Sequence, residues 1–206
     1  KIEVYALLGA VEWGYEEDGA TLLAHLEKIV QYNVQSSEKE KFDGVMLDIE
    51  PYISDSWKEN PEEYMDRYIS CMKKGYKFAQ KNHLRTAICI PRHYDNQGLT
   101  SGLEELIKET CDEVAVMNYS CGNEIEAIRT EAALSEKYGK ELHCILEFQE
   151  VGKHGLTENK TYRNKGIDNA KETWEKLQKE YKNINVTRDY HWSRPVREML
   201  EEKNAD

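Results

Sequence analysis

The sequence has little positive charge, few phenylalanines and no long apolar run, and these absences narrow its function. Its 206 residues carry 28 lysines and arginines against 39 aspartates and glutamates, a formal net charge of -11 at pH 7. A surface of that sign repels phosphate backbones, so we expect no nucleic acid as a partner. No run of 18 apolar residues is present, so we expect no membrane insertion.

The five cysteines show none of the spacings that bind a metal or build a disulfide framework. Their number is odd, and the chain has no CxxC pair and no Cys/His ligand pattern. It also lacks a P-loop and a GxGxxG pattern, so nothing indicates a bound nucleotide. The sequence therefore predicts a protein that works without a cofactor or a metal.

Short apolar runs alternate with longer amphipathic ones along the whole chain. The strands are expected at Ile2–Leu8, Gly44–Ile49, Thr86–Ile90, Glu113–Asn118, Leu142–Phe148 and Val186–Trp192. The helices are expected near Thr21–Tyr32, Pro61–Lys81, Leu103–Thr110, Glu124–Tyr138, Asn169–Tyr181 and Pro195–Glu202. Strands that alternate with helices of this length indicate parallel βαβ units and an α/β fold.

These units are fewer than a closed barrel needs, since a (β/α)8 TIM-type barrel typically has eight strands and about 250 residues. We interpret residues 1–206 as a single barrel domain that holds strands three to eight and lacks the first two. An open sheet with its own topology is the alternative. Missing strands would leave an apolar flank uncovered, so we expect an N-terminal segment or an oligomer partner to complete the barrel. The chain starts at Lys1 rather than methionine, which fits a processed or trimmed N-terminus.

The most informative segment runs from Phe42 to Pro51. Its apolar, β-branched residues predict a buried strand, yet it carries Asp48 and Glu50 at a spacing of two. Side chains two apart on a strand project from the same face. Two neighbouring carboxylates are costly to bury unless they are paired or have a chemical role, and barrels keep their chemistry at the carboxyl ends of strands. We therefore expect both acids at the rim of an active site.

Ionisable or aromatic residues also follow nearly every other expected strand, as a ring of site residues at one rim would require. The expected substrate-binding residues are Trp13, Tyr52, Arg92, His93, Met117, Glu147, His191 and Trp192. The 13 tyrosines and 4 tryptophans outnumber the 3 phenylalanines, and aromatic rings with a polar tip suit sugar stacking as well as half-exposed helix faces. The same rim could hold a metal ion, but hydrolytic metal centres usually contribute more histidines.

Two strand ends resemble those of glycoside hydrolase family 18, the chitinases and endo-β-N-acetylglucosaminidases. Residues 43–50, DGVMLDIE, are similar to the family's DGxDxDxE strand, and residues 117–120, MNYS, are similar to its later Met-x-Tyr-Asp strand. Their order and separation agree with the fourth and sixth barrel strands. The chain also resembles a broader set of uncharacterised bacterial TIM-barrel proteins, and this resemblance favours a secreted or cell-surface location.

The resemblance implies a carbohydrate substrate and substrate-assisted hydrolysis, in which the 2-acetamido oxygen of an N-acetylhexosamine attacks its own anomeric carbon. By this resemblance Glu50 would be the general acid, Asp48 would orient the acetamido group, and Tyr119 would donate a hydrogen bond to its carbonyl. An adjacent carboxylate in a confined pocket would raise the pKa of the acid, as that role requires.

Two positions depart from the family's pattern and leave alternatives open. Met46 stands where the family has its middle aspartate, and Ser120 stands where an aspartate follows the tyrosine. One alternative is a retaining glycosidase with Glu50 as acid/base and Glu147 as nucleophile, which needs carboxyl groups about 5–5.5 Å apart. The other is a barrel that binds glycans without turnover.

Overall fold

A computed structural model describes residues 2–205 of the chain. These residues fall into two compact units. The first holds the chain up to Ile90 together with Tyr94–Val114, and the second holds Pro91–His93 and the chain from Ala115 onward. Within the described range, no helix is both long enough and apolar enough to cross a membrane.

The described residues form six strands, whose hydrogen-bonded order follows their order in the chain. They are β1 (Tyr5–Leu8), β2 (Gly44–Leu47), β3 (Arg85–Pro91), β4 (Glu113–Met117), β5 (Glu141–Glu147) and β6 (Val186–His191). The pairs β1–β2, β2–β3 and β5–β6 are parallel. The predicted α/β class is confirmed, and residues 2–205 do not form a closed eight-stranded barrel.

Helices follow the strands as predicted, with short additions in the loops. The α-helices are α1 (Ala20–Gln35), α2 (Asp55–Glu59), α3 (Pro61–Lys81), α4 (Thr100–Thr110), α5 (Glu124–Ala127), α6 (Arg129–Tyr138), α7 (Ile167–Glu180) and α8 (Ser193–Ala205). The 3-10 helices are η1 (Val11–Tyr15), η2 (Pro51–Ile53), η3 (Asp95–Gln97) and η4 (Lys153–Gly155). The helix expected over Glu124–Tyr138 is broken at Ile128, where φ is -125° and ψ is 20°.

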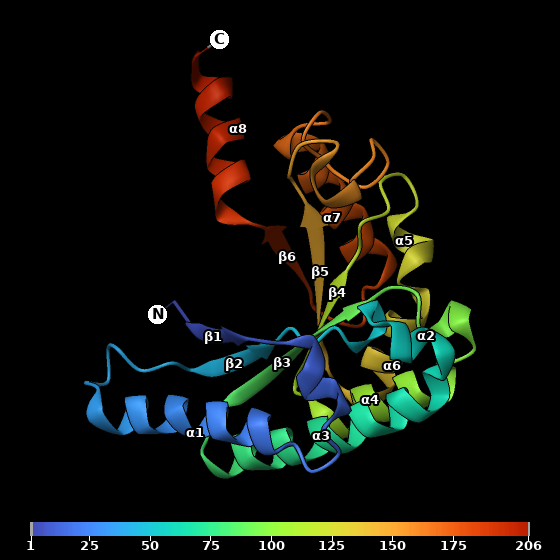
Figure 1. The fold of residues 1–206 in the computed structure, drawn as a ribbon. Helices are drawn as coiled ribbons and strands as arrows, with labels where there is room; N and C mark the ends of the chain where they lie inside the picture. The colour runs from blue at the N-terminus through green and yellow to red at the C-terminus, as the bar shows by residue number, and fades with distance from the viewer. Residues whose placement is uncertain (1, 206) are drawn as a thin grey trace. The chain divides into compact units, whose positions relative to one another are not determined.

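In the first unit, α1, α3 and α4 lie side by side along one face of β1–β3 (Figure 1). Helix α3 opens on Pro61 with two glutamates in its first turn, where the helix dipole favours them. Tyr68, Cys71 and Met72 recur at helical spacing and are fully buried, so this stripe of α3 faces the core.

The first strand carries exposed apolar side chains. β1 is the first strand in the sheet order, and among the described residues its strand partner is β2. Leu7 of β1 is 65% exposed, and Val4 and Ile2, which precede the strand, are 49% and 87% exposed. The covering of these apolar side chains by an N-terminal segment or an oligomer partner stays a proposal.

In the second unit, the core forms between β5, β6 and α7. Trp174 of α7 is buried and donates its indole N–H to the Cys144 carbonyl at 2.8 Å. The ring centroid of Phe148 lies 6.2 Å from that of Trp174 and 5.3 Å from that of Tyr190. Cys144 and Phe148 are both buried, so this part of the chain packs against α7.

Gly9 allows the chain after β1 to lie directly against Asp48. A Cβ at position 9 would stand 1.9 Å from the Asp48 carbonyl oxygen, which is backbone and cannot rotate away. We expect Gly9→Ala to lower the free energy of unfolding by roughly 1–3 kcal/mol, as measured by urea denaturation. Gly102→Ala in α4 is the control, because its new Cβ meets side-chain atoms of Met65 from α3, which can rotate, rather than backbone. A Gly9→Ala protein with the wild-type urea midpoint would contradict the expectation.

Candidate active site

The two predicted acids follow β2 in the first unit. The Asp48 N–H donates to the Leu8 carbonyl at 2.8 Å, so the strand pairing continues one residue beyond β2. Burial alternates along this segment, with Leu47 and Ile49 buried and the two acids half-buried. Asp48 and Glu50 are thus spaced as the strand pattern predicts, on the less buried side of the segment. The chain then turns into η2 at Pro51.

Three tyrosines surround these acids, and the five residues Asp48, Glu50, Tyr52, Tyr68 and Tyr94 are called the acid–tyrosine cluster below. The Tyr52 hydroxyl donates a short hydrogen bond to Oε1 of Glu50. The Tyr52 ring meets the buried Tyr94 edge-on, with 5.9 Å between the centroids. Tyr68 comes from α3 and is fully buried.

The environment keeps all three phenols protonated. Burial raises the pKa of Tyr52, and its hydrogen bond to the Glu50 carboxylate raises it further. Burial is also the largest cause at Tyr94 and Tyr68, where the pKa is raised well above the usual value. The charge of Glu50 adds to the effect at Tyr94, and that of Asp48 contributes at Tyr68. Each hydroxyl is therefore available as a hydrogen-bond donor at neutral pH.

Tyr68 is the residue that the sequence interpretation did not assign to the site. Its hydroxyl is buried and has no hydrogen-bond partner among residues 2–205. A hydroxyl buried without a partner is costly unless a ligand or water satisfies it. The helical stripe on α3 identifies Tyr68 as a core residue, and the one further signal is that the stripe uses tyrosine where phenylalanine would pack equally well.

Glu147, at the end of β5 in the second unit, is held by four hydrogen bonds. The backbone N–H groups of Phe148 and Gln149 both donate to Oε1 at 2.8 Å. His191 Nδ1 lies 2.8 Å from Oε2, and the Gln149 side-chain amide donates to the same oxygen at 3.2 Å. An ionised carboxylate only accepts, so Nδ1 must carry the hydrogen of the His191 contact. We call Glu147 and these donors the Glu147 network.

Hydrogen bonds lower the pKa of Glu147 by more than burial raises it. Burial is the largest single effect and by itself would raise its pKa. The hydrogen bonds and positive charge offered by His191, together with those from Gln149, oppose burial, and the net result is a pKa below the usual 4.5. Glu147 is therefore an ionised carboxylate that is only 2% exposed.

Other predicted site residues of the second unit gather around His191. The ring of Tyr119 stacks on that of His191, with 6.0 Å between centroids. Trp192 is 46% exposed and lines a hollow of about 390 Å³ together with Gln149, Lys153 and Arg194. This hollow holds one exposed aromatic face among polar groups, which is the composition that sugars favour.

The remaining predicted residues lie outside the acid–tyrosine cluster and the Glu147 network. Trp13 sits in η1 and packs on His25 of α1, with 4.5 Å between ring centroids. Met117 is the last residue of β4, and Arg92 and His93 follow β3, all half-buried. The predicted residues thus form one set in each unit, and their joint role stays a proposal.

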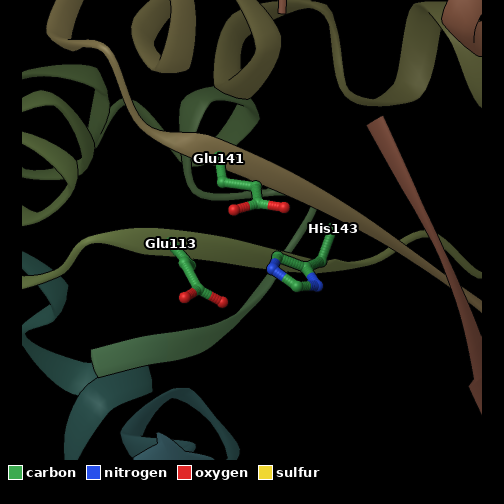
Figure 2. A group of neighbouring side chains, drawn as sticks. All are labelled: Glu113, Glu141 and His143. Atoms are coloured by element: carbon green, nitrogen blue, oxygen red, sulfur yellow. The ribbon is translucent and has the colours of Figure 1, made fainter. Parts of the chain in front are cut away.

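The amino-terminal end of β5 carries a second group of ionisable residues. Figure 2 shows Glu141 and His143 projecting from the same side of that strand. His143 Nδ1 lies 3.1 Å from Asp189 of β6. Figure 2 also labels Glu113, the first residue of β4, which accepts a hydrogen bond from the Tyr5 hydroxyl at 2.6 Å. The His143 imidazole thus has a carboxylate partner on the neighbouring strand β6.

The comparisons with known proteins show a similar fold but do not show a family. No family model matches the chain, and neither does any curated protein. A solved dihydropteroate synthase from Anaplasma phagocytophilum is similar, with a TM-score of 0.59 and 10% identity over 98% of this chain and 73% of that one. A group II chitinase catalytic domain from Ostrinia furnacalis has TM-scores of 0.44 and 0.42 in two structures, at 14% identity over 78% of this chain and 51% of that chain. At such identities likeness concerns the fold alone, and the first one shows a TIM-barrel-like α/β fold.

Proposed function

We propose that the protein is a glycoside hydrolase that cleaves a glycosidic bond beside an N-acetylhexosamine, with Glu50 as the general acid. The observation that carries the proposal is the acid–tyrosine cluster at the end of β2. There a half-buried glutamic acid lies two residues from a second carboxylate, among phenols that stay protonated. This is the motif that resembles the acidic strand of glycoside hydrolase family 18.

The hydrogen bonding of Glu50 leaves one of its two oxygens for the substrate. Tyr52 occupies Oε1, whereas Oε2 accepts no hydrogen bond from the residues that the structure describes. The proton on Oε2 would pass to the glycosidic oxygen as the C1–O bond breaks, while the acetamido oxygen of the same sugar forms a bond to C1. Water then opens this oxazolinium intermediate, and its proton returns to Glu50.

Asp48 would act on the acetamido group rather than on the leaving oxygen. As a carboxylate it accepts the N–H of the acetamido group, which turns the acetamido oxygen toward C1. Trp13, an aromatic residue of the same unit, is proposed to contact a neighbouring sugar.

The Glu147 network speaks against the alternative in which Glu147 is the nucleophile. A carboxylate has about four lone-pair positions, and here four donors fill them. A nucleophilic oxygen must point an unshared pair at the anomeric carbon. Glu147 is therefore better suited to holding His191 and the chain at Gln149, beside the stacking face of Trp192.

Paired aryl glycosides test the proposal. We expect the protein to hydrolyse a nitrophenyl N-acetylhexosaminide and to leave the matching hexoside, which lacks the acetamido group, intact. Glu50→Gln should remove this activity, whereas Glu59→Gln, an exposed glutamate of α2, should leave it unchanged.

Two results would overturn the proposal. Hydrolysis of plain hexosides, lost in Glu147→Gln, would establish the two-carboxylate retaining mechanism instead. No turnover of either substrate, with N-acetylhexosamine oligomers still bound, would identify a glycan-binding protein without catalysis.

A further inference from the structure

The second unit contains a cavity that the proposed glycosidase chemistry does not use. Its volume is about 650 Å³. It lies between the loop after β4, helix α5 and one side of α7 from Asn169 to Glu180, and it is called the α7 cavity. Pockets of roughly 300–1,000 Å³ hold small-molecule ligands. The residues that matter to its chemistry are Cys121, Glu124, Tyr162, Lys165 and Lys176.

Glu124 is the central group of the α7 cavity and is only 8% exposed. Its Oε1 atom accepts the Gly122 N–H at 2.8 Å and a short hydrogen bond from the Tyr162 hydroxyl. The Tyr162 oxygen in turn lies 2.8 Å from the Thr173 hydroxyl. Asn118 donates to the Glu124 carbonyl at 2.9 Å, so the backbone is fixed as well. The carboxylate is held in one orientation by its surroundings.

The second oxygen of Glu124 is left for a ligand. Oε2 accepts no hydrogen bond from any residue in the described part of the chain. A carboxylate oxygen in a largely buried position gains most from a charged donor, since such hydrogen bonds are shorter and stronger than neutral ones. The group that fits Oε2 best is therefore an ammonium group.

Two lysines give the same cavity a place for negative charge. Lys165 precedes α7 and Lys176 lies on it, and both line the cavity. Neither forms an ion pair with another residue of the range 2–205. Lysine side chains that face a cavity without a carboxylate partner suit a carboxylate on the ligand.

We propose that the α7 cavity binds a zwitterionic small molecule of the amino-acid class. Its ammonium group hydrogen-bonds to Oε2 of Glu124, and its carboxylate is held by Lys165 and Lys176. The cavity is large enough for a ligand with a chain of several carbons between the two charges. The site is independent of the acid–tyrosine cluster, which belongs to the other unit.

Calorimetric titration with ω-amino acids, from 4-aminobutanoate to 8-aminooctanoate, tests the proposal. We expect saturable binding of at least one member, and binding of hexylamine or hexanoate weaker by roughly 10- to 100-fold, the contribution of one charge-assisted contact. Glu124→Gln should weaken binding of the amino acid by a similar factor. Its Oε1 still accepts hydrogen bonds from Gly122 and Tyr162, whereas Oε2 is replaced by an amide nitrogen. Glu126→Gln is the matched control, since Glu126 lines the same cavity but is already paired with Arg129 at 3.0 Å.

Cys121 supplies a second readout that does not depend on calorimetry. It lines the cavity, and the other four cysteines are buried. Burial, and next the charge of Glu124, raise the pKa of its thiol to about 11, with Lys165 opposing them. Alkylation by iodoacetamide should slow when the amino acid is bound, and it should be faster in unliganded Glu124→Gln. The proposal is wrong if no ω-amino acid binds saturably, or if Glu124→Gln binds it as tightly as the wild type with an unchanged melting temperature.

Discussion

Glu50→Gln is expected to lower kcat by about 10²–10⁴-fold on a chitooligosaccharide, the usual contribution of a general acid. The sugar that leaves in this reaction is a poor leaving group, because its oxygen must gain a proton as the C1–O bond breaks. Glutamine is nearly the same shape and can still accept the hydrogen bond from Tyr52, so the acid–tyrosine cluster keeps its packing. The loss would therefore come from the missing proton.

The dependence of the rate on the leaving group distinguishes general acid catalysis by Glu50 from a structural disturbance caused by the substitution. A dinitrophenolate departs without protonation, so a dinitrophenyl N-acetylhexosaminide should lose far less activity in Glu50→Gln than the oligosaccharide does. Steady-state kinetics on both substrates, with Glu59→Gln as the control, make the comparison. Equal losses on the two substrates would mean that Glu50 is structural and is not the acid.

Glu147→Ala is expected to have the largest effect on stability. It leaves the N–H groups of Phe148 and Gln149 without their acceptor and removes the partner of His191. Buried donors that lose their acceptor cost about 1–3 kcal/mol each, so we expect a total loss of roughly 2–5 kcal/mol. For a chain of this length, that lowers the melting temperature by roughly 5–15 °C.

The control for this change is Glu150→Ala, three residues from the start of η4. Glu150 is exposed and lies 4.0 Å from Lys153, and such surface pairs contribute little. Calorimetric melting of both variants gives the comparison. If Glu147→Ala and Glu150→Ala have the same melting temperature, the Glu147 network does not stabilise the second unit.

Acid should remove the same contribution in the wild type. The pKa of Glu147 is lower in the folded chain than its usual 4.5, so its ionisation stabilises the fold above that pH. This contribution is lost as the pH falls from 4.5 through the lower pKa of the folded state. The stability difference between wild type and Glu147→Gln should therefore shrink over that interval.

The elements of this fold could be predicted from sequence because each follows from a local pattern. The run Gly44–Leu47 is apolar and bounded by charged residues, and Pro61–Lys81 has a proline start and helical spacing; both elements are present. The five residues of α2 could not be predicted, since one turn is too short to show a periodicity. The break at Ile128 also has no local signal, because no glycine or proline marks it.

The site residues could be predicted where an ionisable residue interrupts an apolar strand. They could not be predicted where the site depends on tertiary packing. Asp48 and Glu50 stand out because acids are rare in an apolar strand. Tyr68 has the spacing of any core residue, and its approach to Asp48 depends on how α3 lies against β2. Glu124 has no sequence signal either, since its value as a ligand comes from Tyr162, 38 residues along the chain.

The exposed first strand and the acidic composition act together on the solubility of the protein. The side chains of Val4 and Leu7, with Ile2, would allow two molecules to associate edge to edge through β1. A net charge of -11 at pH 7 keeps such molecules apart by mutual repulsion. That repulsion vanishes near the isoelectric point of 5.1 and is screened by salt. The net negative charge of this chain therefore opposes self-association through β1 at neutral pH.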